Sequence, residues 1–181
     1  MTITRFFHAA IAISALFIGL VQPAQADIVT WTGDTTGGPS FDRPFVDFSD
    51  LSPNGAGAIY DTIEISVTED GEYSFTMHGV GFDTFLLLYE TAFNPADPLV
   101  NGVAANDDLA SLRTSGFAAD LVAGTEYFVV VTGFSSVDAG AYSLTISGEG
   151  AISAVPEPST WLMLAIGLGA LVHARRTTRQ R

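Results

Sequence analysis

Short runs of alternating apolar and polar residues, separated by turn residues, fill the chain from residue 27 to residue 153. Alternation with a period of two is typical of strands that bury one face, and this region lacks the 3.6-residue period of an amphipathic helix. Residues 85–88 and 127–131 are apolar at every position, which predicts central strands covered on both faces. We therefore predict an all-β fold, an antiparallel β-sandwich of jelly-roll-like form.

The clearest pair of predicted strands flanks residues 69–71. Six apolar residues alternate along this pair: Ile63, Ile65, Val67, Tyr73, Phe75 and Met77. A three-residue loop sets Val67 opposite Tyr73 and keeps the six on one face, whereas a two-residue loop mixes the faces. We predict a hairpin with Gly71 in the left-handed conformation, which places His78 opposite Thr62.

The N-terminal 26 residues have the three parts of a secretory signal peptide. Arg5 supplies positive charge, residues 6–21 are apolar, and the small residues Ala24 and Ala26 form a cleavage site. We expect export through the Sec machinery and cleavage by signal peptidase before Asp27. The alternative is an uncleaved N-terminal anchor.

The exported region is strongly acidic. All 20 acidic residues of the chain lie in residues 27–157, where only Arg43 and Arg113 oppose them, and the chain has no lysine. Such a surface repels nucleic acid and attracts cations. The chain also has no cysteine, which excludes disulfides, thiolate metal sites and a cysteine nucleophile.

The C-terminal stretch has three parts in a fixed order. The triplet Pro156, Glu157 and Pro158 is followed by an apolar run over residues 161–174 and then by Arg175 and Arg176. As a helix the run reaches only ~20 Å, short of the ~30 Å hydrocarbon core. Basic residues beside such a run hold that end on the cytoplasmic side.

Residues 155–181 resemble the PEP-CTERM sorting signal in this order of parts. The resemblance implies a bacterium with an outer membrane, and a tail that is anchored transiently in the inner membrane and cut there by exosortase. The alternative is a weak single-pass transmembrane anchor. Before the tail, we expect the sandwich to span residues 27–147 and a flexible small-residue linker to span residues 148–154.

The predicted sandwich also resembles the bacterial pre-peptidase C-terminal domain over residues 58–147. The resemblance rests on the segments Tyr60–Ile63, Glu69–Tyr73, Phe82–Glu90, Ala105–Asp108, Leu121–Val131 and Gly140–Leu144. The family implies a jelly-roll-like sandwich, usually appended to secreted proteases. Some of its members bind calcium or extracellular matrix.

Calcium is the cofactor that the residues favour, because it binds six to eight oxygen ligands. Asn106, Asp107 and Asp108 share one turn, and the family resemblance implies that Asp83 lies near it. These four residues are the candidate calcium ligands. The alternative is that they are ordinary turn formers that bond to local backbone groups. A second, weaker acidic group consists of Asp42, Asp47 and Asp50.

Catalysis has little support in the sequence. His78 is the single histidine outside the two ends, and no nucleophile motif accompanies it. We expect no catalytic residues, and instead an exported cell-surface or extracellular-matrix protein associated with exopolysaccharide or biofilm. The alternative is a calcium-dependent module that binds carbohydrate or protein, for which Phe93 and Phe134, both in predicted loops, are the candidate ligand rings.

Overall fold

The structure, a computed structural model, describes residues 26–154. The predicted signal peptide, apart from Ala26, and the predicted sorting residues Pro156, Glu157, Pro158, Arg175 and Arg176 lie outside the described residues. The elements are β1 (Asp27–Asp34), β2 (Ser40–Phe41), the 3₁₀ helix η1 (Pro53–Gly55), β3 (Ala58–Val67), β4 (Gly71–Gly79), β5 (Thr84–Glu90), β6 (Gly102–Asn106), β7 (Thr114–Leu121), β8 (Glu126–Gly133), β9 (Ala141–Gly148) and β10 (Ile152–Ala154). Between residues 26 and 154, no helix is long and apolar enough to cross a membrane.

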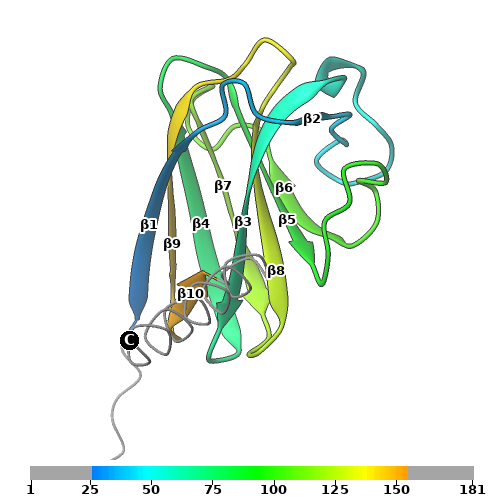
Figure 1. The fold of residues 1–181 in the computed structure, drawn as a ribbon. Coiled ribbons are helices and arrows are strands. Elements are labelled where there is room, and N and C mark those ends of the chain that lie inside the picture. Colours follow the sequence, from blue (N-terminus) through cyan, green and yellow to red (C-terminus); the bar gives the residue numbers. More distant parts are fainter. Residues whose placement is uncertain (1–25, 155–181) are drawn as a thin grey trace, which may run out of the picture.

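The strands form two sheets that face each other (Figure 1). One sheet has the order β1-β9-β4-β7, and the other has the order β10-β3-β8-β5-β6, with β2 added beside β3. The paired strands are antiparallel throughout both sheets. The prediction of an antiparallel β-sandwich is therefore confirmed.

Strand β5 is covered on both faces, as its apolar run predicts. Leu86 and Leu88 belong to the core between the sheets, while Phe85, Leu87 and Tyr89 belong to a second cluster on the outer face of the larger sheet. All five side chains are at most 1% exposed. Neighbouring β8 is divided in the same way between the two clusters, so β5 and β8 form the centre of this sheet.

The loops between β2 and β3 and between β5 and β6 provide the cover on this outer face. Their rings and those of the strands beneath form edge-on and tilted contacts, with centroids 4.8–5.5 Å apart. The rings are Phe41, Phe48, Tyr60, Tyr89 and Phe93, which we call the outer aromatic cluster. Phe93, predicted to present its ring to a ligand, is partly buried in this cluster and contributes to its packing.

The predicted hairpin between β3 and β4 is wrong. Strand β3 pairs with β8 and β10, whereas β4 pairs with β7 and β9 in the opposite sheet, so the chain crosses between sheets at residues 68–70. Gly71 has a φ of 158°, far from the left-handed helical region. His78 lies opposite Thr114 and Ser143 instead of Thr62.

The predicted alternation is nevertheless correct. Five of the six apolar side chains are at most 3% exposed in the core between the sheets, namely Ile65, Val67, Tyr73, Phe75 and Met77, and Ile63 packs against them partly buried. In a sandwich the inner faces of two sheets meet. The same alternation therefore fits two facing strands as well as two paired ones.

Residues 148–154 differ from the predicted flexible linker. They end β9, turn, and form β10, in which Ile152 is 6% exposed within the core. Gly148 and Gly150 leave no room for a Cβ beside the ring and hydroxyl of Tyr73. The amide of Gly150 donates to that hydroxyl at 3.1 Å, and the amide of Ile152 donates to Asp27 Oδ2 at 3.0 Å. The small residues thus permit close packing at this position.

We predict that Ile152→Ala lowers the free energy of unfolding by about 2 kcal/mol or more, because it leaves a cavity in the core. Ser153→Ala, one residue further along β10 and exposed, serves as the control and should change it by less than about 0.5 kcal/mol. Denaturant unfolding of the exported protein measures both values. Equal stabilities for Ile152→Ala and Ser153→Ala would show that β10 is not docked.

Candidate metal centre

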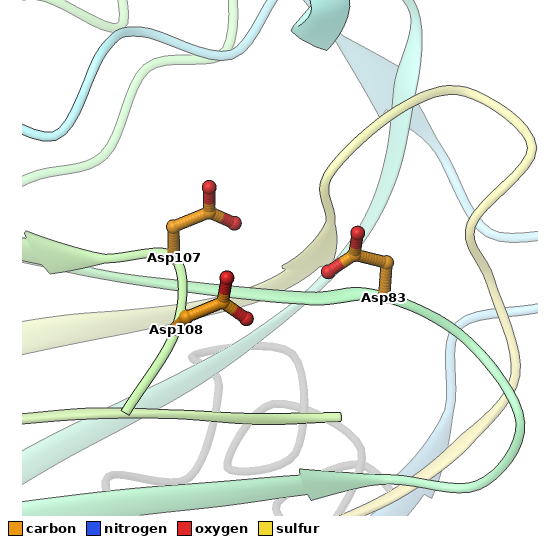
Figure 2. A group of neighbouring side chains, drawn as sticks. All are labelled: Asp83, Asp107 and Asp108. Atoms are coloured by element: carbon orange, nitrogen blue, oxygen red, sulfur yellow. The ribbon is translucent and has the colours of Figure 1, made fainter. Parts of the chain in front are cut away.

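Three aspartates meet at one end of the larger sheet. Asp83 lies immediately before β5, and Asp107 and Asp108 follow β6 directly. Because β5 and β6 are antiparallel neighbours, with Leu86 opposite Asn106, the start of one strand lies beside the end of the other. One carboxylate oxygen of each aspartate lies within 4.8 Å of the others, and Figure 2 shows the three groups converging from the two segments.

The oxygens of this acidic cluster are poorly satisfied within the protein. Asp83 Oδ1 and Asp107 Oδ1 are buried and have no hydrogen-bond partner, while Asp108 is exposed. Buried polar atoms normally have a partner, and an unpaired carboxylate oxygen is especially unfavourable. A hard divalent cation binds carboxylate oxygens of this kind. The donor set therefore fits a calcium ion.

Burial and repulsion disfavour ionisation of the cluster. Burial, with the charges of Asp107, Asp138 and Asp108, raises the pKa of Asp83 to about 6, and Arg43 opposes this shift. Burial and the charge of Asp108 also raise the pKa of Asp107, again against Arg43. A bound cation would favour the ionised form of both groups.

Arg43 is a buried cation that sequence reasoning missed. The residue is 2% exposed, and its guanidinium carbon lies 3.8 Å from the centroid of the Phe85 ring. Nη1 donates to the carbonyl of Pro44 at 3.0 Å, and Nη2 donates to the carbonyl of Phe134 at 2.6 Å. The single available signal was its rarity, as one of two basic residues in an acidic region.

The loop between β8 and β9 holds the backbone of Asp83. Phe134 donates its amide to the Asp83 carbonyl at 3.0 Å, and the Asp83 amide donates to Asp138 Oδ1 at 3.4 Å. Asp138 Oδ2 accepts from the amide and hydroxyl of Ser135, which closes the loop. Phe134, the second candidate ligand ring, lies with its centroid 5.2 Å from the guanidinium of Arg43. The ring is partly buried and belongs to the surroundings of the cluster.

The structure brings together three of the four predicted calcium ligands. Asn106 is the exception, because its Oδ1 accepts a hydrogen bond from the amide of Gly116 at 3.0 Å. That bond joins the end of β6 to β7 in the other sheet. Asn106 thus joins the two sheets instead of binding a metal ion or a local turn amide.

The second acidic group is not a cluster in the described part of the chain. Asp42, Asp47 and Asp50 each accept a hydrogen bond from a nearby backbone amide, those of Gly57, Ser49 and Leu51 respectively. Only Asp83, Asp107 and Asp108 form a group with metal-ligating geometry among residues 26–154. These three residues are the candidate site.

Several solved structures resemble the fold at low sequence identity. The pre-peptidase C-terminal domain of a Bacillus anthracis collagenase has a TM-score of 0.44 and 13% identity, and the alignment covers 65% of this chain and 87% of that one. A Yersinia pseudotuberculosis-derived mitogen has a TM-score of 0.41 and 17% identity, and the alignment covers 68% of this chain and 86% of that one. The CBM35 of Abf62 from Cellvibrio japonicus has a TM-score of 0.35 and 16% identity, and the alignment covers 71% of this chain and 99% of that one. No curated protein sequence matches the chain.

The C-terminal end matches a family model. Residues 154–179 match the PEP-CTERM protein-sorting motif, which confirms the resemblance of the tail. The match begins at Ala154, the last residue of β10, so the motif follows the folded domain directly. The chain is an exported protein whose C-terminal membrane-anchoring motif directs its sorting by exosortase.

Proposed function

We propose that this protein is a non-catalytic module of the cell surface or extracellular matrix, and that Asp83, Asp107 and Asp108 bind calcium. The observation that carries the proposal is the convergence of three carboxylates with two buried, unpaired oxygens. A calcium ion would satisfy both oxygens and join the loops before β5 and after β6. In a domain without cysteine, such an ion stabilises loops as a disulfide does elsewhere.

The cluster lies away from the point at which the sorting motif begins. Strand β10, from which the sorting motif continues, pairs with residues 65–67 at one end of β3 (Figure 1). Asp83 precedes Thr84, which pairs with Gly133 on β8, one residue past the Thr132–Tyr60 pair near the opposite end of β3. About six residues of strand, roughly 20 Å, therefore separate the cluster from Ala154, where the sorting motif begins.

The exposed side of the site suits an oxygen-rich partner. With one oxygen from each carboxylate, the cluster supplies three of the six to eight oxygens that calcium binds, and Asp108 is exposed. Hydroxyl or carboxylate groups of a matrix exopolysaccharide would complete the coordination. This partner also suits an acidic domain, because the calcium ion neutralises the repulsion that the carboxylates would otherwise exert.

We predict that calcium raises the thermal midpoint of the exported protein. At a concentration one hundred times the dissociation constant, the stabilisation is about 2.7 kcal/mol, which corresponds to roughly 10 °C for a domain of this size. Melting curves in calcium and in chelator measure the shift. Asp107→Asn should remove most of it, and Asp120→Asn, an exposed aspartate on β7, should retain it. A wild-type midpoint that is unchanged at millimolar calcium contradicts the metal site.

We also predict calcium-dependent binding to matrix exopolysaccharide. The exported protein should co-sediment with polysaccharide purified from the producing cells in calcium and remain in solution in chelator. Asp107→Asn should reduce the bound fraction several-fold, with Asp120→Asn as the control. Equal binding in calcium and chelator would show that the cluster does not contact the polysaccharide.

Mass spectrometry of the exported protein tests the processing of both ends. The mature chain should begin at Asp27 and end before Trp161, because signal peptidase and exosortase remove the apolar segments. Deletion of the exosortase should restore the intact tail. A mature chain from normal cells that still ends at Arg181 contradicts cleavage of the sorting motif.

A further inference from the structure

Arg43 is connected to the acidic cluster through backbone and ring contacts. Its Nη2 donates to the carbonyl of Phe134, whose amide donates to the carbonyl of Asp83. The guanidinium also lies against the ring of Phe85, two residues beyond Asp83. The cation is therefore held in place beneath the loop that carries one of the proposed ligands.

Arg43 lies close enough to the cluster to feel its charge but forms no hydrogen bond to its carboxylates. Both of its hydrogen bonds go to backbone carbonyls, and its Nε is buried without a partner. Burial lowers the pKa of Arg43, and the charges of Asp107 and Asp83 oppose that shift. A buried cation is strongly unfavourable unless negative charge compensates it, and these two aspartates provide that charge.

We propose that Arg43 is a built-in counter-ion of the acidic cluster, which weakens the binding of a divalent cation there. This inference rests on the proposed calcium site. The three carboxylates carry three negative charges and Asp138 adds a fourth beside Asp83, whereas Arg43 with one divalent ion carries three positive charges. Arg43 thus stabilises the cluster when the ion is absent and repels the ion when it binds. Arg43 is a positioning residue that sets the affinity of the site and makes no contact with the metal.

A neutral residue at position 43 should therefore tighten calcium binding. At an effective dielectric constant of about 20, a unit charge several ångströms from a divalent ion repels it enough to weaken binding roughly ten-fold or more. Arg43→Gln retains a hydrogen-bond donor for the Phe134 carbonyl, Arg43→Met retains apolar packing against Phe85, and Arg43→Lys retains the charge. We expect the Gln and Met variants to bind calcium at least ten-fold more tightly than wild type, and the Lys variant to stay within about three-fold of wild type.

Calorimetric titration of the exported protein with calcium measures these affinities, and melting curves establish that each variant folds. A structural role alone would weaken binding in all three variants, so tighter binding in the neutral variants is specific to the charge. Unchanged or weaker binding in a folded Gln or Met variant overturns the inference while leaving the calcium site intact. A wild-type protein that binds no calcium overturns both.

The neutral variants remain informative even when they fail to fold without calcium. Tighter binding by a neutral site implies that millimolar calcium restores their cooperative thermal transition, because binding to the folded state shifts the equilibrium toward it. Restoration supports the inference. Variants that stay unfolded at millimolar calcium, while the Lys variant folds, overturn it.

Discussion

The two-sided burial of β5 and β8 determines how this domain is built. Both strands are apolar on both faces, so the larger sheet requires a cover on each side. The smaller sheet covers the inner face, and the loops after β2 and β5 cover the outer face with aromatic rings. The loop after β2 carries Arg43 with it and buries the guanidinium against Phe85 on β5. The packing requirement of the core thus places a cation beside the start of β5.

The charges at that end of the sandwich follow from the same arrangement. The antiparallel pairing of β5 with β6 places Asp83 beside Asp107 and Asp108, and the loop after β8 fixes the backbone of Asp83 through Phe134 and Asp138. Burial and mutual repulsion then disfavour the ionised carboxylates. Arg43 compensates one charge, and calcium would compensate two more. The opposite end of the sandwich leads through β10 to the sorting motif, so attachment and the proposed binding site are separated within one small domain.

Much of the fold could be predicted from the sequence, because alternation reports which side chains are buried. It identified the central run in β5 and the inner faces of β3 and β4. It could not identify their partners, since Ile65 and Tyr73 face the same core from opposite sheets. The glycines at 148 and 150 indicated flexibility, whereas their lack of a side chain serves close packing against Tyr73. Residue type alone cannot separate these two uses of glycine.

The candidate site was predictable in part for a similar reason. Asp83, Asp107 and Asp108 have the chemistry and the strand-end positions of calcium ligands, and the structure brings them together. Asn106 also carries an oxygen ligand, but its Oδ1 accepts a hydrogen bond from the amide of Gly116. That contact, and the burial of Arg43, depend on long-range packing that no local pattern encodes.

A crystal structure of the exported protein grown with millimolar calcium tests the central claim most directly. It should show one ion about 2.3–2.6 Å from oxygens of Asp83, Asp107 and Asp108. Three carboxylates with no ion between them under those conditions would contradict it.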